Sequence, residues 1–273
     1  MKKKHLLVSL IAVTLLSNSY LHAASVGSGR TIPQGQLAVG AEYNHIFDKD
    51  MDPKTKGLDG YDSMEIDESN QVYGVISYGL FQNDRLAADL SVKLGAGDLV
   101  TQGVDGTFFN KERIEYDMGF LWGIGGKVGI QFDKGWSLSL HAGYDAWESD
   151  LDSITYSGEK AFNVEGAKTA KVSEFQAAIL FNFHLDMKES NGMVFVPYVG
   201  PVFDWMRVKT GRISYETASF TSTNTATGAK DAKDNVGVVV GADVFCFNDA
   251  LKLNVEGRFI SEEALSVSLR YRF

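Results

Sequence analysis

The chain has 273 residues, a net charge of −9 and one cysteine. A single cysteine excludes an intrachain disulfide, and an acidic chain is a poor match for nucleic acid, whose phosphates bind basic surfaces. The length permits one large domain or two small ones.

The N-terminus predicts a secretory signal peptide. Three lysines at 2–4 precede an apolar run at 6–16, and a small-residue region ending at Ala23 or Ala24 follows. The run is too short for a membrane-spanning helix, which needs about 20 residues. We therefore expect residues 1–23 to be a signal peptide and residues 24–273 to be one mature domain. Cleavage removes three of the 26 basic residues and none of the 35 acidic ones, which leaves a net charge of −12.

The rest of the chain contains segments in which apolar and polar side chains alternate, which is the period of a β-strand. The clearest runs from 114 to 132. It exceeds the usual strand length of about three to ten residues and suits a tilted strand that crosses a bilayer. At 71–81 and 193–208 both faces are apolar, so the alternation does not identify which face of these strands points inward. The predicted strands are 35–47, 71–81, 86–97, 114–132, 136–146, 172–185, 193–208, 235–247, 251–259 and 264–273.

The connections alternate between long and short. The long ones are 48–70, 98–111, 148–170 and 209–234, and the last, 261–263, is short where the rhythm requires a long one. Outer-membrane barrels have long external loops and short periplasmic turns, and a spanning sheet must close because hydrocarbon cannot pair an open edge. We predict an all-β fold, a transmembrane antiparallel up-and-down β-barrel of ten strands, with eight or twelve as alternatives. A secreted soluble β-sandwich would explain the alternation but not the strand lengths or the loop rhythm.

The final strand carries a specific pattern of outward apolar residues. They are Leu265, Val267, Leu269, Tyr271 and Phe273. In this the chain resembles the bacterial outer-membrane β-barrel proteins, in which such a strand is read by the barrel-assembly machinery. The resemblance implies location in the bacterial outer membrane of a Gram-negative cell, with that machinery, outer-membrane lipid and lipopolysaccharide as partners. By size the chain is similar to small OmpA- and opacity-like barrels, and by strand number to the ten-stranded omptins.

The polar face of the strands predicts a charged barrel interior. Ten strands leave an interior mostly filled by side chains, in which charges of both signs neutralise one another. A salt-bridged plug is the favoured interpretation, and a narrow selective pore is the alternative. The groups that pair with the inward arginines at 270 and 272 would distinguish the plug from the pore. The predicted interior charges are Glu115, Asp117, Lys127, His141, Asp145, Glu174, His184, Glu256, Arg258, Arg270 and Arg272.

Catalysis and metal binding have weaker support. His141 and Asp145 lie four residues apart on one strand face, about 13 Å, too far to pair. Pairing of His184 with Asp145 or Asp117 would depend on an unknown register, so we expect no enzyme and no cofactor. The first loop contains four aspartates spaced in part like a calcium loop, but Pro53 replaces the required glycine. These weak calcium candidates are Asp48, Asp50, Asp52 and Asp59.

The sequence therefore predicts an integral outer-membrane barrel with a structural or surface-interaction role through acidic external loops, for an unknown surface ligand. A narrow porin-like diffusion channel is the alternative. A barrel hydrolase is less favoured.

Overall fold

The computed structural model describes residues 27–28, 30–53, 61–105, 111–132, 135–187, 193–211, 213–219 and 228–273. The predicted signal peptide lies outside these residues. Within them we find no helix with the length and hydropathy needed to cross a membrane.

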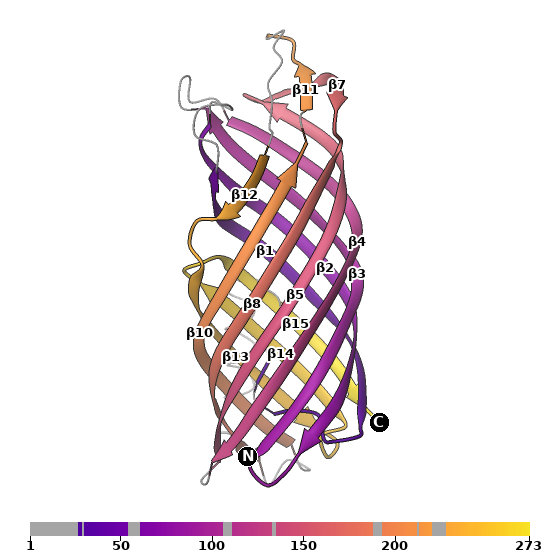
Figure 1. The fold of residues 1–273 in the computed structure, drawn as a ribbon, viewed down its shortest axis with the longest axis vertical. Coiled ribbons are helices and arrows are strands. Elements are labelled where there is room, and N and C mark those ends of the chain that lie inside the picture. Colours follow the sequence, from indigo (N-terminus) through magenta and orange to yellow (C-terminus); the bar gives the residue numbers. More distant parts are fainter. Residues whose placement is uncertain are drawn as a thin grey trace, which may run out of the picture.

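Ten strands form a closed antiparallel barrel, which confirms the predicted fold class and strand number (Figure 1). Each barrel strand pairs with the next in the chain, and β1 closes the cylinder by pairing with β15, where Ala38 lies opposite Arg272. Short turns and Phe273 lie at the lower end in Figure 1. The barrel strands are β1 (Leu37–Pro53), β2 (Tyr61–Gln82), β3 (Leu86–Asp105), β4 (Lys111–Phe132), β5 (Trp136–Tyr156), β8 (Thr169–Phe183), β10 (Met193–Thr210), β13 (Val236–Cys246), β14 (Leu251–Phe259) and β15 (Glu263–Arg272).

The barrel wall is not of uniform height. Seven strands have 15 to 22 residues, whereas the consecutive strands β13, β14 and β15 have only 9 to 11. Above these three strands, β12 (Gly228–Ala232) pairs with β1 on one side and with β10 on the other. The upper part is therefore a closed barrel of the eight strands β1, β2, β3, β4, β5, β8, β10 and β12.

This change of strand number explains where the predicted loops were wrong. Most of 48–70 and 98–111, and residues 148–156 and 169–170 of the third segment, continue the barrel strands upward instead of forming loops. The short connection at 261–263 lies beneath β12. The strand that takes the place of β13, β14 and β15 in the upper wall is β12, and it comes from the predicted loop 209–234. We call the eight-stranded part the extension and the ten-stranded part the lower barrel.

Four short strands complete the described structure. β6 (Glu159–Lys160) pairs with β5, and β9 (Leu185–Met187) pairs with the start of β10. β7 (Phe162–Gly166) and β11 (Ile213–Glu216) form a separate two-stranded sheet above the extension (Figure 1).

An apolar belt surrounds the lower barrel. Outward side chains on its strands are large, apolar and exposed, which would be unfavourable in water over such an area. Because hydrocarbon cannot satisfy a sheet edge, a closed barrel with such a belt is the architecture that spans the bacterial outer membrane, the location expected from the sequence. The belt includes Val39, Tyr43, Val72, Ile76, Leu90, Val92, Leu94, Phe120, Trp122, Ile124, Leu140, Phe175, Ile179, Phe181, Val199, Phe203, Val240, Leu253 and Leu269.

Candidate functional site

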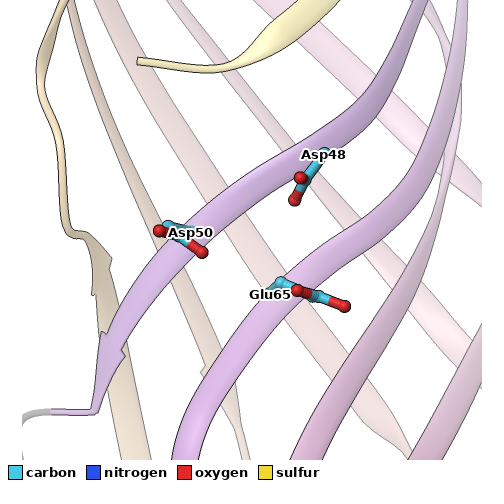
Figure 2. Close-up of side chains that lie close together, drawn as sticks. All are labelled: Asp48, Asp50 and Glu65. Atoms are coloured by element: carbon cyan, nitrogen blue, oxygen red, sulfur yellow. The ribbon is translucent and has the colours of Figure 1, made fainter. Parts of the chain in front are cut away.

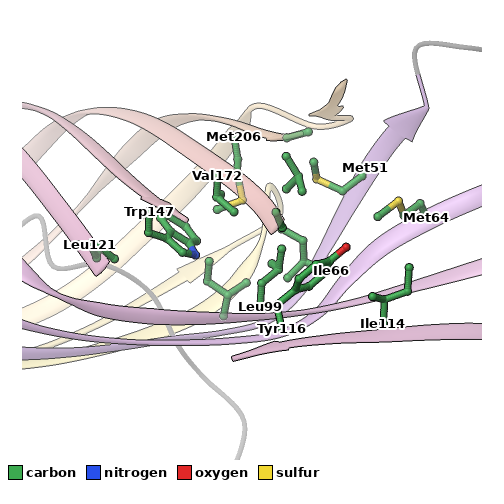
Figure 3. Close-up of a cluster of buried hydrophobic side chains, with 14 of the residues drawn as sticks. Met51, Met64, Ile66, Leu99, Ile114, Tyr116, Leu121, Trp147, Val172 and Met206 are labelled. Carbon is green, nitrogen blue, oxygen red and sulfur yellow. The ribbon is translucent and has the colours of Figure 1, made fainter. Parts of the chain in front are cut away.

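The interior of the extension is filled by an apolar core. Inward side chains from β1, β2, β3, β4, β5, β8 and β10 contact one another across the barrel axis (Figure 3). An eight-stranded barrel is just narrow enough for side chains to fill, so water has little room beside them. The core includes Ile46, Met51, Met64, Ile66, Leu99, Ile114, Tyr116, Leu121, Trp147, Ile154, Val172, Met206 and Val208.

A buried ionic cluster lies at the junction between the extension and the lower barrel. The Lys49 Nζ atom is 2.5 Å from Asp204 Oδ2 and 2.9 Å from Glu262 Oε2. Arg258 Nε is 3.0 Å from Glu262 Oε1, and carboxylate oxygens of Glu174, Asp204 and Glu262 lie within 4.8 Å of one another. All five side chains are buried, so the two cations offset carboxylate charge that no solvent reaches. We call these five residues the junction cluster.

A second ionic network crosses the lower barrel. Lys93 Nζ lies 3.3 Å from Glu42 Oε1 and 3.4 Å from Asp145 Oδ2, and Arg270 Nη2 lies 3.1 Å from Glu42 Oε2. The ammonium group of Lys93 also lies 4.9 Å from the centre of the Tyr73 ring. The network joins β1, β3, β5 and β15, and its two positive and two negative charges cancel.

The described N-terminal residues occupy the lower lumen. The Gly27 amide donates to Glu256 Oε2 (2.9 Å), and the Ser28 amide donates to Asp243 Oδ2 (3.1 Å). Lys127 Nζ donates to the Ser28 carbonyl oxygen (2.8 Å). Ser28 is fully buried, so this segment lies among the lumen side chains and fills part of the space they leave.

Most of the predicted interior charges lie in the lumen. Lys127, Asp145, Glu174, Glu256 and Arg258 are buried there, and His141 lies opposite Lys127 on the neighbouring strand. Arg270 is mostly buried beside Glu42. At the lower mouth, Arg272 donates to the carbonyl oxygen of Asn248, and His184 contacts Ser137.

The prediction was wrong for Glu115 and Asp117. The pairing of β4 with β5 passes from Tyr116–Leu151 directly to Leu121–Trp147, so β4 contains a bulge that inverts its alternation. Above the bulge the inward residues are Ile114 and Tyr116, which the sequence placed on the outer face. Glu115 lies on the outer surface of the extension beside Arg113, and Asp117 is exposed.

Sequence reasoning missed two members of the junction cluster. Lys49 was assigned to an external loop, but a bulge between Ile46 and Asp48 turns its side chain inward. Glu262 was assigned to the last turn, which the surrounding strands enclose. A lysine between aspartates at 48 and 50 carries no local signal of burial. The bulge and the height difference between neighbouring strands together enclose Lys49, and the height difference also encloses Glu262.

The predicted calcium loop does not form as expected. Asp48 and Asp50 lie on β1 and meet Glu65 of β2, so a strand pair brings the carboxylates together (Figure 2). Asp52 lies opposite Asp231 of β12, and Asp59 falls outside the described residues. The three carboxylates are on the outer face and largely open to solvent. Exposed acidic groups of this kind are common without a bound ion.

The lower mouth contains a cavity of about 600 Å³. Arg30, Arg85 and Arg272 line it together with His184 and Ser137. The Ser137 Oγ atom is 2.9 Å from His184 Nε2, which is the contact of a nucleophile with a base. In the described part of the chain, the other ring nitrogen of His184 has no hydrogen-bond partner to orient the imidazole, as a triad requires.

The predicted assembly strand is the described strand β15. Leu269, Tyr271 and Phe273 are exposed on the outer face, and Leu265 and Val267 lie on the same face. The Phe273 amide donates to the Leu37 carbonyl oxygen at the seam between the last and first strands (2.9 Å). Recognition by the assembly machinery stays a prediction.

Comparison with known proteins gives structural likenesses only. No family model matches the sequence, and no curated protein matches it. The translocator domain of the autotransporter NalP from Neisseria meningitidis matches with a TM-score of 0.43 and 10% identity, covering 100% of this chain and 97% of that one. The β-domain of the Bordetella autotransporter BrkA has a TM-score of 0.39 and 13% identity, covering 88% and 99%. The outer membrane protein OprG from Pseudomonas aeruginosa has a TM-score of 0.36 and 10% identity, covering 89% and 98%.

Proposed function

We propose that this chain is a non-conducting outer-membrane barrel that holds a rigid, acid-faced extension above the bilayer for a structural or surface-interaction role. The apolar core inside the extension supports the proposal most strongly. A diffusion channel needs a continuous water path, and buried apolar side chains interrupt such a path just above the junction cluster.

The outer surface of the extension supports the interaction role. Acidic side chains project outward at alternate positions on β1 and β5, as at Asp48, Asp50, Asp150 and Asp152. Hydrogen-bonded strands continue beneath them, so the charges are held on a stiff cylinder instead of a long loop. Such a surface would attract a cationic partner at long range.

Planar-bilayer recording of the purified chain tests the closed lumen. We expect no stepwise current for the unaltered protein. Stepwise currents that persist in detergent-matched reconstitutions would contradict the proposal and favour the narrow channel.

A second recording identifies which element closes the lumen. The double variant Asp243→Asn and Glu256→Gln weakens the bonds that hold Gly27 and Ser28 in the lower lumen. We expect this variant to stay silent because the extension still blocks the axis. Currents confined to this variant would instead make the N-terminal segment the gate.

The proposal contains no catalytic step. Ser137 and His184 lie within hydrogen-bonding distance, but activity would also need an orienting group and oxyanion donors around a bound ester or amide. A hydrolytic activity that disappears on His184→Ala would therefore add a function without altering the closed lumen.

A further inference from the structure

The outer face of the barrel contains a hollow of about 510 Å³ where four strands pass from the apolar belt to the extension. Its lower rim carries the aromatic residues Phe120, Trp122 and Tyr144, and its upper rim carries Lys171 and Lys209. The hollow thus lies at the upper edge of the apolar belt, where the outer face changes from aromatic to charged side chains.

The shape of the hollow follows from small side chains and the β4 bulge. Ala146 of β5 and Ser173 of β8 are cross-strand partners and form part of the lining. Next to them, the residues of β4 between Tyr116 and Leu121 do not pair with β5. Gly119 permits this close approach, because a Cβ atom there would clash with the carbonyl oxygen of Glu148. The hollow is therefore set by backbone geometry and not by one movable side chain.

The lower rim is an exposed aromatic surface. Phe120 is 66% exposed and Trp122 is 45% exposed, and the Trp122 and Tyr144 ring centroids are 5.7 Å apart. Trp and Tyr occupy the interfacial girdles of membrane barrels, where one edge contacts acyl chains and the other contacts headgroups. This rim fits the first carbons of lipid acyl chains.

The upper rim carries more positive than negative charge. Lys171 and Lys209 are Cα partners on β8 and β10, so two like charges face outward from opposite positions. Such a pair is unfavourable unless an anion lies between its members. Glu148 Oε1 lies 2.6 Å from Lys171 Nζ, whereas Lys209 has no ionic partner among the described residues. The rim therefore has one unneutralised cation above the aromatic surface.

We propose that this hollow binds the phosphorylated headgroup of an acylated outer-leaflet glycolipid of the lipid A type. A phosphate lies between the Lys171 and Lys209 ammonium groups, and the acyl chains follow Phe120, Trp122 and Tyr144 downward. Charge complementarity and the position of the hollow at the belt edge select this occupant. The proposal rests on the outer-membrane orientation proposed above but not on the closed lumen, which bilayer recording tests separately.

Native mass spectrometry of the full chain in detergent micelles, titrated with hexa-acylated diphosphoryl lipid A, tests the site. We expect Lys171→Ala with Lys209→Ala to weaken binding by about tenfold or more, since charge-assisted bonds to phosphate are lost. The charge-matched control is Lys111→Ala with Lys233→Ala, which removes two exposed lysines outside the hollow and should change binding less than about twofold. Circular dichroism checks that every variant is folded.

Two further measurements separate this site from general attraction to anions. Glu148→Gln removes the competing carboxylate, so we expect diphosphoryl lipid A to bind about two to three times more tightly, within the usual size of a surface charge effect. Dephosphorylated lipid A should bind the lysine variant and the unaltered chain alike. The proposal would be refuted if the unaltered chain and the double lysine variant bound diphosphoryl lipid A equally, or if Glu148→Gln weakened that binding.

Discussion

The lower barrel and the extension share seven strands but have opposite polarity. In the lower barrel Ile124 faces outward and Lys93 faces inward, whereas in the extension Val208 faces inward and Asp50 faces outward. Each outer face matches its surroundings, because hydrocarbon accepts apolar side chains and water accepts charges. The extension is therefore organised like a water-exposed protein that continues from a membrane barrel without a break in its hydrogen-bonded wall.

Two local features produce this reversal. Bulges in β1 and β4 invert the alternation of those strands near the junction. The replacement of β13, β14 and β15 by β12 narrows the cylinder from ten strands to eight. A narrower cylinder is more easily filled by side chains, so an apolar core forms there, while the wider part holds charged networks and the N-terminal segment.

The largest expected effect comes from placing a carboxylate in each interior. Val208→Asp puts an unpaired charge into the apolar core, and we expect a loss of more than about 4 kcal/mol in the free energy of unfolding. Ser77→Asp is equally buried but lies beside Arg270, so we expect a loss of about 1 kcal/mol. Urea unfolding in reconstituted vesicles measures both. Equal losses would contradict the difference between the two interiors.

The next effect concerns the junction cluster. Arg258→Met leaves the carboxylates of Glu174, Asp204 and Glu262 with only Lys49 beside them, and we expect a loss of about 3–5 kcal/mol. Adding Glu262→Gln removes the carboxylate that has lost its Arg258 partner, so the double variant should recover part of the lost stability. A double variant as unstable as Arg258→Met in the same unfolding assay would show that packing, and not charge balance, holds the junction.

A charge placed on the outer surface should destabilise the lower barrel more than the extension, which is the reverse of the order expected for a charge placed in the interior. Ile124→Lys places an ammonium group in the apolar belt, and we expect a loss of up to about 4 kcal/mol in the free energy of unfolding, since a lipid-facing lysine costs about 2–4 kcal/mol at the bilayer midplane and less toward its edges. Asp152→Lys on the extension should change stability by less than about 0.5 kcal/mol. Similar effects would mean that the boundary between belt and extension lies elsewhere.

The smallest expected effect concerns a surface ion pair of the extension. Arg113 lies 2.9 Å from Glu115 and also pairs with Asp67, and all three side chains are about one-third exposed. Arg113→Ala should therefore cost less than about 1 kcal/mol, and less still at high salt.

The pH dependence provides a second measurement of this pair. Hydrogen bonds from Arg113 and Ser153 hold the pKa of Glu115 below its ordinary value. The ionised Glu115 carboxylate therefore adds to the free energy of unfolding at neutral pH, and this stabilisation is lost as the pH falls through the lowered pKa. Arg113→Ala should reduce this acid-dependent part, leaving the share that comes from the Ser153 hydrogen bond, whereas an unchanged pH profile would show that the Arg113–Glu115 pair contributes nothing.

Alternation in the sequence was enough to predict the ten barrel strands and the inward position of residues such as Asp145 and Arg258. It failed for Glu115, because a bulge shifts the two-residue period without a clear signal in single residues. It also failed for Lys49, whose burial depends on a bulge in its own strand and on neighbouring strands of unequal height. The hollow at Lys171 and Lys209 could not be predicted, since it needs the register of four strands at once.

The sequence by itself determined that the chain forms a closed barrel with an apolar belt, because period-two alternation over long segments fixes which face meets lipid. It also left one question open: what the charged face, including Arg270, pairs with. Only the tertiary structure placed Glu42 beside Arg270, closed the upper cylinder with β12 and filled it with apolar side chains. Those outcomes depend on strand height and cross-strand register, which arise when distant segments meet.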